Sequence, residues 1–487
     1  MKLKNYIGGE WVDARRGTRT ATVNPADRRE ETAEYPLSHP EDVDDAIAAA
    51  QRAFPEWSAW PAPKRGRVLA RAAARVTERI EKLARVLTLD EGKTLEESRA
   101  ELRRAAEALE FCAGETRRLA GETLPSEVPG RLVMTLREPL GVVGLLTPWN
   151  FPAQIAAWKI GPALATGNTV VFKPSSLTPW ISQEILSDLV AALEHEGAPK
   201  GVVNLVSGTG AVVGPALAAH PKVAAVSFTG SLATGTAVHE TLAKRGAPCL
   251  AEMGGKNPMV VLDDADIAYS ATSCVRGAFG NAGQRCTATS RAIVHERVYS
   301  DFVAHLVDRT SRLKVGPGIA EGVDIGPLVS AANLEQVERV VDAAIAAGAT
   351  RHIGGERSRD PAHQHGSFYL PTVLADVAPD AEIAQEEVFG PVVAVIKAKD
   401  DAHALALANG VRYGLSASVY TRDLKRALFF ARGFEAGIVH VNSPTVGGET
   451  HVPFGGMKAT GVGGRERGSA AVDFFTRWKT VYVDSAP

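Results

Sequence analysis

The sequence predicts an α/β protein with parallel sheets, and three observations lead to that fold class. Short apolar strands alternate with amphipathic helices along most of the 487 residues, as in strand–helix–strand units. Four strand–turn–helix units, the first starting at residue 142, follow one another within fewer than 100 residues. The chain is also longer than one hydrophobic core usually holds, so we expect two or three domains.

Residues 41–120 are expected to be mainly helical, because EDVDDAIAAAQRAFPEW and the segment after it repeat apolar residues at three-to-four spacing. Short β-branched runs ended by proline or glycine are typical of buried parallel strands. Such runs occupy residues 142–148, 169–175, 202–208 and 224–230. Strands of this kind, each followed by a helical pattern, favour a dinucleotide-binding sheet.

A second α/β run begins with MVVLDD, directly after AEMGGKNP at 251–258, and reaches about residue 440. The segments 131–141 and 478–484 stand apart, since both alternate like the strands of a hairpin. An exposed terminal strand tends to pair with another chain. We therefore expect the two segments to pair with each other and to extend toward a neighbouring subunit.

The composition argues against several classes of partner. The 54 basic and 56 acidic side chains leave a net charge of −2, without the basic surplus of a nucleic-acid-binding protein. The longest apolar stretches, such as 141–151, are shorter than the ~20 residues that span a bilayer, and the N-terminus has no apolar signal core. Four cysteines without paired spacing suggest a reducing compartment, and no zinc pattern occurs. We expect a cytoplasmic protein without a nucleic-acid, membrane or metal partner.

Two glycine turns are ambiguous. SGTGAVVG at 207–214 approaches the G-x-G-x-x-G fingerprint, but the third glycine is one place late. A tight strand-to-helix turn at Gly208 is therefore as good an interpretation as phosphate contact. In FTGSLATG, Gly230 permits close backbone approach, and Ser231 could either cap the next helix or offer a hydroxyl to an anion.

FKPSS at 172–176 places Lys173 at the carboxyl end of a strand, where open α/β sheets bind ligands. A lysine there could meet ribose hydroxyls or a phosphate. Ser176 lacks the carboxylate that would repel a 2′-phosphate, so we expect the site to accept NADP as well as NAD.

Cys286 is the candidate nucleophile. It lies in the turn-rich segment AFGNAGQRCTA, whereas Cys112, Cys249 and Cys274 fit apolar core patterns. Arg285 beside it is expected to favour the thiolate. Asn150, between prolines in PWNFP, could share an oxyanion with a backbone N–H at Cys286.

Glu252 ends the apolar run CLAEM. A carboxylate in such a place is either part of a structural ion pair or a general base whose pKa burial raises. The segment alone leaves both interpretations open.

The ordered set TPWNFP, FKPSS, FTGS, AEMGGKNP, GQRC, EEVFGP (386–391) and NSP…PFGGMK (442–458) resembles the NAD(P)-dependent aldehyde dehydrogenase superfamily over nearly the whole chain. The resemblance implies a Rossmann-like dinucleotide-binding domain, an α/β catalytic domain and a small β oligomerisation extension. The implied boundaries are 1–120 with 142–252, 253–440, and 121–141 with 441–487. It also implies a homodimer or homotetramer.

The resemblance also implies roles for individual residues. Cys286 would be the nucleophile, Glu252 the general base, Asn150 the oxyanion amide, and Lys159 a lysine near the proton path behind the base. The implied cofactor-binding set is Thr147, Pro148, Trp149, Lys173, Ser175, Ser176, Gly208, Phe228, Gly230, Ser231, Thr234, Met253, Gly254, Glu387 and Phe389. The implied substrate-binding set is Trp158, Gln154, Arg285 and Thr287.

These roles imply oxidation of an aldehyde to a carboxylic acid through a cysteine thiohemiacetal and thioester. Glu252 favours hydrolysis over transfer to coenzyme A. The GQRCTATSR segment, together with loops near 443–452 and 459–464 that are one residue longer than usual, resembles bacterial α-ketoglutarate semialdehyde dehydrogenases. Succinate semialdehyde, or a broad range of aliphatic and aromatic aldehydes, is the alternative substrate. A thiol hydrolase or acyltransferase is the alternative from another class, and it would leave the cofactor motifs without a purpose.

Overall fold

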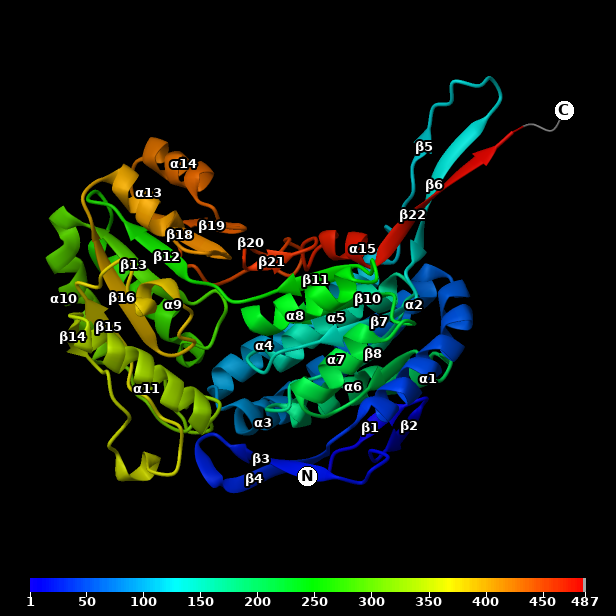
Figure 1. Cartoon of the computed structure of the whole chain (residues 1–487), viewed down its shortest axis with the longest axis horizontal. Coiled ribbons are helices and arrows are strands. Elements are labelled where there is room, and N and C mark those ends of the chain that lie inside the picture. The colour runs from blue at the N-terminus through cyan, green and yellow to red at the C-terminus, as the bar shows by residue number, and fades with distance from the viewer. Residues whose placement is uncertain (485–487) are drawn as a thin grey trace.

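The computed structural model describes residues 1–484, and two large sheets form the two halves of the molecule (Figure 1). The first sheet has the strand order β2-β1-β9-β8-β7-β10-β11-β21. Its five central strands are parallel and buried along their whole length. They are β7 (Val142–Leu146), β8 (Thr169–Lys173), β9 (Val203–Leu205), β10 (Ala225–Thr229) and β11 (Cys249–Glu252).

Helices cover both faces of this sheet, which is why its strands are nearly continuous apolar runs. One face packs against α1 (Pro40–Ala59), α7 (Gly210–Ala219) and α8 (Leu232–Ala243). The opposite face packs against α2 (Ala62–Glu78), α3 (Ile80–Glu91), α4 (Leu95–Glu115), α5 (Pro152–Ala165) and α6 (Pro179–His195). The helical prediction for residues 41–120 is therefore confirmed as far as Glu115.

The strand order creates a crevice beside β7. The chain runs outward from β7 through β8 to β9 and then returns to β10 on the other side of β7. Where the direction of winding reverses, the turns after neighbouring parallel strands diverge and leave room for a ligand at their carboxyl ends. The turns after β7 and β10 carry Trp149 and Gly230, two residues of the predicted cofactor set.

The second sheet has the order β14-β15-β16-β13-β12-β18-β19, parallel except for the antiparallel pair β14 and β15. Its hydrophobic core is one continuous cluster. The strands are β12 (Asn257–Val261), β13 (Thr289–His295), β14 (Thr350–Ile353), β15 (Thr372–Ala375), β16 (Val392–Ala398), β18 (Ser416–Tyr420) and β19 (Ile438–Val441). The helices are α9 (Ile267–Phe279), α10 (Tyr299–Thr310), α11 (Ala331–Ala346), α12 (Glu382–Gln385), α13 (Asp401–Asn409) and α14 (Leu424–Gly433).

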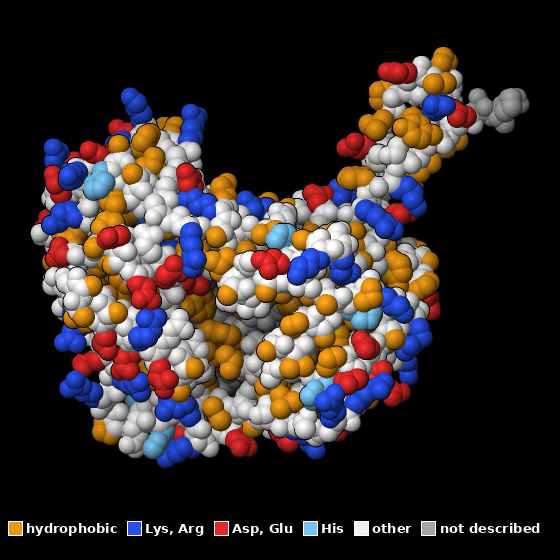
Figure 2. Space-filling model, viewed as in Figure 1, with side chains coloured by type: hydrophobic (Ala, Val, Ile, Leu, Met, Phe, Trp, Pro, Cys, Tyr) orange, Lys and Arg blue, Asp and Glu red, His pale blue; other side chains and the backbone are white. Residues whose placement is uncertain are grey.

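A narrow extension projects from the first half (Figure 1). It is a sheet of three strands: β5 (Thr123–Leu124), β6 (Leu132–Pro139) and β22 (Thr476–Val483). The short helix α15 (Ala470–Phe474) comes directly before β22. The predicted pairing of the two outlying segments is confirmed, because β6 and β22 run antiparallel from Leu132–Val483 to Pro139–Thr476. Apolar side chains remain exposed on this extension (Figure 2). They include Leu132, Leu136, Trp478, Tyr482 and Val483.

Short elements complete the fold. At the N-terminus β1 (Asn5–Ile7) and β2 (Glu10–Val12) join the first sheet, and β3 (Arg19–Asn24) pairs with β4 (Asp27–Pro36). Near the C-terminus β17 (Tyr413–Gly414) pairs with β20 (Met457–Lys458), and β21 (Gly461–Val462) pairs with β11. Short 3-10 turns occupy Gly280–Gly283, Glu296–Val298 and Pro361–His363.

The pairing of β21 with β11 has a consequence for the site. It places Gly461 beside Glu252, although the resemblance assigned residues 441–487 to the oligomerisation extension. The α/β fold class is confirmed, whereas the exact domain boundaries stay a prediction. Within residues 1–484, no helix combines the length and the apolar character that crossing a membrane requires.

Candidate active site

A cavity of about 220 Å³ lies at the carboxyl edge of the first sheet, where the two halves face each other across a hollow backed by hydrophobic side chains (Figure 2). Residues from both halves line it. They include Pro148, Trp149, Asn150, Gly230, Ser231, Met253, Gly254, Cys286, Glu387 and Phe389. The structure therefore brings together most of the residues predicted to bind a cofactor.

A second cavity, of about 230 Å³, lies on the other side of Cys286. All four predicted substrate residues line it: Trp158, Gln154, Arg285 and Thr287. Cys286 and Ile155 are common to both cavities. The sulfur therefore lies at the junction between the cofactor crevice and a second pocket, where it can meet ligands from both sides.

The loop before Cys286 has an unusual backbone. Asn281, Ala282 and Gly283 follow one another with φ of 53°, 52° and 69°, a left-handed region that non-glycine residues seldom occupy. At Gly283 a Cβ atom would lie 2.0 Å from the carbonyl oxygen of Gly390, so only glycine fits there. This turn reverses the chain after α9 and presents Cys286 to the seam between the two halves.

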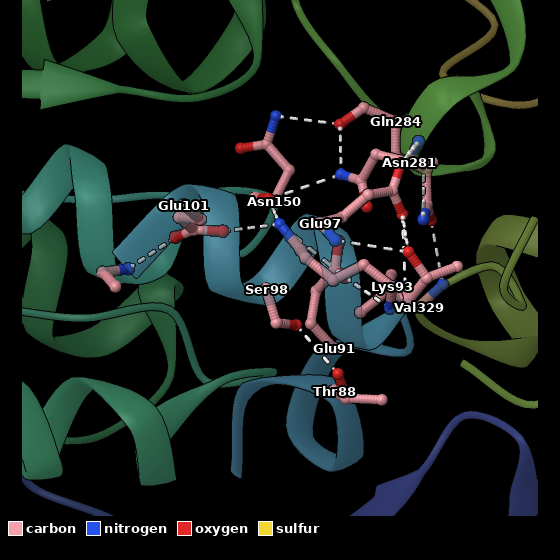
Figure 3. Close-up of polar contacts among 12 residues, drawn as sticks. Thr88, Glu91, Lys93, Glu97, Ser98, Glu101, Asn150, Asn281, Gln284 and Val329 are labelled. Atoms are coloured by element: carbon pink, nitrogen blue, oxygen red, sulfur yellow. Dashed lines mark hydrogen bonds and ion pairs between the residues drawn. The ribbon is translucent and has the colours of Figure 1, made fainter. Parts of the chain in front are cut away.

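Asn150, in the turn between β7 and α5, is fixed against the nucleophile loop (Figure 3). Its Nδ2 donates a hydrogen bond of 3.0 Å to the carbonyl oxygen of Gln284. Its own carbonyl oxygen accepts a bond of 2.6 Å from Lys93 Nζ. An amide nitrogen carries two hydrogens, so one remains to stabilise an oxyanion beside Cys286.

A buried ion pair supports that amide. Lys93 Nζ lies 2.6 Å from Glu101 Oε2, and both side chains are fully buried. Glu101 Oε1 also accepts hydrogen bonds from the backbone of Ala153 and Gln154, at 2.9 and 3.2 Å. These are N–H groups of the first turn of α5, which lack partners within the helix. Glu101 therefore caps the helix that follows Asn150, and Lys93 holds the turn itself.

The same helix, α4, also holds the cysteine loop. Glu97 Oε1 accepts a hydrogen bond of 2.5 Å from the backbone N–H of Asn281 and one of 3.3 Å from Arg285 Nη2. Figure 3 shows Glu97 pointing toward Asn281 while Glu101 points toward the start of α5. One helix thus sets the spacing between the oxyanion amide and the nucleophile.

The expectation that Arg285 favours the thiolate is wrong. Its guanidinium turns away to Glu97, and the cation that acts on the sulfur is Arg467. Burial raises the pKa of the Cys286 thiol to about 12, and the negative charge of Glu387 adds to this increase. Arg467 and a backbone hydrogen bond from Thr287 lower the pKa of the thiol, but burial dominates.

Glu252 is buried, and its carboxylate does not line either cavity as the side chain now lies. Oε2 accepts a hydrogen bond of 2.9 Å from Gly456 N–H, and Oε1 has no partner among the described residues. Burial raises the pKa of Glu252 well above the ordinary value, and the negative charge of Glu466 raises it further. Of the two interpretations left open by the sequence, this favours a general base whose pKa burial raises, and such a base must lose its proton before it can accept one from water.

Glu466 is a buried residue that the sequence analysis missed. It forms an ion pair with Lys159, whose Nζ also donates a hydrogen bond of 2.7 Å to Ser227 Oγ. Its other oxygen accepts a bond of 2.8 Å from Trp158 Nε1. Lys159 is thus close to the predicted base, as expected. The motif GGRERG contains Glu466, but nothing in its polar neighbours signals that β21 carries it into the core.

Glu387 and Phe389, both in the predicted cofactor set, line the crevice. Glu387 is buried, accepts a hydrogen bond of 2.9 Å from Gly255 N–H, and has a pKa that burial raises to about 7. A Cβ atom on Gly254 would lie 2.4 Å from this carboxylate, so the glycine makes room for it. Phe389 meets Trp149 edge to face, with ring centroids 5.3 Å apart.

Ser231 is the N-cap of α8: its hydroxyl accepts a hydrogen bond from Thr234 N–H and donates one to Thr234 Oγ1. A Cβ atom on Gly230 would lie 2.6 Å from the ring of Phe228, so this ring needs a glycine beside it. Gly208 lies in a tight turn, since a Cβ atom there would come within 2.8 Å of Val213. The remaining members of the set do not line the cavity: Thr147 follows β7, Lys173 ends β8, and Ser175 and Ser176 come just after it.

Lys173 is buried and donates a hydrogen bond of 2.7 Å to the carbonyl oxygen of Pro174, with no carboxylate partner in the described chain. Burial lowers the pKa of this lysine to about 8. A ligand hydroxyl or phosphate would supply a partner that the protein does not.

A model of the aldehyde dehydrogenase family matches residues 11–481. The chain belongs to this family.

Similarity to individual aldehyde dehydrogenases extends over nearly the full length. The chain is 45% identical to an α-ketoglutarate semialdehyde dehydrogenase of Haloferax volcanii, over 98% of both chains. It is 42% identical to an α-ketoglutaric semialdehyde dehydrogenase of Bacillus subtilis, over 98% of this chain and 97% of that one. The crystal structure of betaine aldehyde dehydrogenase from Staphylococcus aureus, in complex with NAD+, superimposes with a TM-score of 0.96 at 36% identity, covering 100% of this chain and 95% of that chain.

The two loops predicted to be one residue longer than usual both reach the site. From the loop near 443–452, Val446, Gly447 and Gly448 line the second cavity. From the loop near 459–464, β21 pairs with the strand that ends in Glu252. Both loops therefore belong to the surroundings of Cys286 and Glu252.

The raised pKa of Glu252 predicts how the rate of this aldehyde dehydrogenase depends on pH. Only the ionised carboxylate can accept a proton, and that form becomes populated as the pH rises through a pKa well above the usual carboxylate range. We expect the steady-state kcat to increase with pH over that upper range and the increase to be lost in Glu252→Gln. The measurement is kcat against pH for both proteins. A wild-type kcat that is already at its plateau in mildly acidic buffer would contradict the prediction.

Proposed function

We propose that this chain oxidises α-ketoglutarate semialdehyde to the dicarboxylic acid, with NADP or NAD as the oxidant. The observation that carries the proposal is the position of Cys286 where two cavities meet, one lined by eight of the predicted cofactor residues and the other containing four cationic side chains. The two semialdehyde dehydrogenases of Haloferax and Bacillus support the substrate, and the betaine aldehyde dehydrogenase complex supports a nicotinamide cofactor.

The residues of the crevice fit such a cofactor. The buried Thr147 hydroxyl has no hydrogen-bond partner among the described residues, and the buried Lys173 ammonium has a single one, the carbonyl oxygen of Pro174. Lys173 and Ser176 would hold the adenosine ribose, Gly230 and Ser231 the pyrophosphate, and Glu387 the nicotinamide ribose. No carboxylate stands at position 176 to repel a 2′-phosphate. A bound nicotinamide supplies the hydride acceptor.

In the first half-reaction the Cys286 thiolate adds to the aldehyde carbon. The oxygen becomes an alkoxide, which the free amide hydrogen of Asn150 and a backbone N–H at Cys286 stabilise. A donor of this kind lowers a barrier by roughly 3–4 kcal/mol. Burial disfavours the thiolate form of Cys286. The charge of Arg467 and the hydrogen bond from the Thr287 N–H favour it. Oxidation of the adduct leaves a thioester on Cys286.

In the second half-reaction Glu252 takes a proton from water, and the resulting hydroxide hydrolyses the thioester. The side chain must first rotate away from Gly456 toward the sulfur. Its electrostatic effect on Cys286 indicates that the two groups are near each other. The proton can then pass toward Lys159 and Glu466, whose buried ion pair lies behind the base.

Succinate semialdehyde or a broad range of aldehydes remains the alternative substrate. The aromatic side chains of Trp158 and Phe454 in the second cavity would favour the broad-range reading. A thiol hydrolase or acyltransferase would leave the crevice beside Phe389 and Glu387 without a ligand. Four thiols without a disulfide support our proposal of a reducing, cytoplasmic location.

Cys286→Ala should lower oxidation of aldehyde by on the order of 10³-fold or more, because no other group can form the thioester. Cofactor binding, followed by quenching of tryptophan fluorescence, should persist. The matched control is Cys112→Ala, which changes a buried cysteine outside both cavities. Substantial formation of NADH or NADPH by Cys286→Ala would refute the assignment of the nucleophile.

Glu252→Gln should release about one equivalent of reduced cofactor per site in a burst and then turn over slowly, since acylation proceeds and hydrolysis does not. Stopped-flow absorbance measures both phases. An unchanged steady-state rate would mean that another group activates water.

We also propose that the extension forms the interface of a homodimer or homotetramer. Its β22 strand is an edge strand, and apolar side chains remain exposed on it. Trp478→Glu combined with Tyr482→Glu should shift the protein to monomers in size-exclusion chromatography with light scattering. Val23→Glu, at a partly exposed position of β3, is the control. A monomeric wild-type protein would disprove the interface.

A further inference from the structure

Four cationic side chains line the second cavity, and one of them differs from the others. Three have a carboxylate partner from α4. These pairs are Lys93–Glu101 at 2.6 Å, Arg104–Glu107 at 2.8 Å and Arg285–Glu97 at 3.3 Å. The fourth, Arg467, forms no ion pair and donates no hydrogen bond to any of residues 1–484, and its buried Nε, like that of Arg285, has no partner. A desolvated guanidinium without an acceptor is costly, so a ligand is its natural partner.

The protein holds this guanidinium in one place. It lies 3.9 Å from the ring centre of Trp158 and 4.5 Å from that of Phe454, so two aromatic rings fix its plane. The indole of Trp158 is itself anchored by its bond to Glu466. Gly448, in the longer loop, leaves room on the far side, because a Cβ atom there would lie 3.1 Å from Arg467 Nη1.

The backbone at Arg467 supports a functional reason for the residue. Its φ is 61°, in the left-handed region that glycine occupies without cost. A non-glycine residue kept there is strained, and such strain is concentrated at binding and catalytic sites. Gly468, the next residue, has φ of 55°. The turn therefore keeps an arginine where a second glycine would be easier to accommodate.

Arg467 is also near the reacting sulfur. Both residues line the same cavity, and the charge of Arg467 lowers the pKa of the Cys286 thiol. A substrate whose aldehyde carbon meets Cys286 would therefore extend along the cavity toward the guanidinium. The planar N–H groups of arginine match the two oxygens of a carboxylate.

We propose that Arg467 binds the distal carboxylate of the semialdehyde and thereby determines the specificity of the enzyme. The inference rests on the proposed function, since it names the residue that recognises the substrate class given there. It assigns this role to Arg467 and not to Arg285, another predicted substrate residue, because the charge of Arg285 is already paired with the carboxylate of Glu97.

The test compares α-ketoglutarate semialdehyde with pentanal, which has the same number of carbon atoms and no carboxylate. For Arg467→Met, kcat/KM toward the semialdehyde should fall about 10- to 100-fold more than kcat/KM toward pentanal, mainly through KM. The ratio of the two losses removes any effect on the Cys286 thiol, which both aldehydes share. Arg467→Lys should restore part of the preference for the charged substrate.

Arg104→Met is the matched control, because it removes a cation of the same cavity that already has a carboxylate partner. Its effect on the preference should stay within about threefold. Equal losses toward both aldehydes in Arg467→Met, or loss of the preference in Arg285→Met instead, would overturn the role of Arg467. A wild-type enzyme that oxidises pentanal but not the semialdehyde would overturn the proposed substrate itself.

Discussion

The buried ion pair between Lys93 and Glu101 fixes the geometry on which the site depends (Figure 3). Removing one partner of such a pair leaves an uncompensated buried charge, which costs about 3–5 kcal/mol. Here it would also release the carbonyl of Asn150 and the first turn of α5. Glu97, one turn earlier on α4, holds the backbone at Asn281. A single helix therefore sets the spacing between the oxyanion amide, which belongs to the first half, and the nucleophile, which belongs to the second.

Burial works against ionisation of the acidic groups in the site. Burial raises the pKa of Cys286, Glu252 and Glu387. The protein thus holds its nucleophile and its base in forms that must lose a proton before they react. Nearby cations and N–H groups offset part of this effect, Arg467 at the sulfur and Lys159 at the carboxylate. If Arg467 also binds the substrate carboxylate, substrate recognition and activation of the thiol involve the same guanidinium.

The sequence was sufficient for the parts that depend on local pattern. Parallel strands and the turn residues after them follow from periodicity and glycine placement, whereas Gly254 and Glu387 came only from the resemblance to the family. It was insufficient where long-range packing decides. The adjacency of Arg285 to Cys286 suggested electrostatic contact, but successive side chains diverge, and Arg285 points to Glu97 on another helix. In the sequence, Glu466 and Arg467 lie in a stretch typical of a polar loop. Only the pairing of β21 with β11 brings this stretch against the first sheet.

Acylation of one sulfur atom is the central claim, and the mass of the acyl-enzyme tests it most directly. Glu252→Gln would be mixed with the oxidised cofactor and the semialdehyde, quenched in acid, digested and analysed by mass spectrometry. We predict that the peptide containing Cys286 gains the mass of the acyl group in proportion to the reduced cofactor formed. Reduced cofactor without any adduct, or an adduct confined to Cys112, Cys249 or Cys274, would contradict the account.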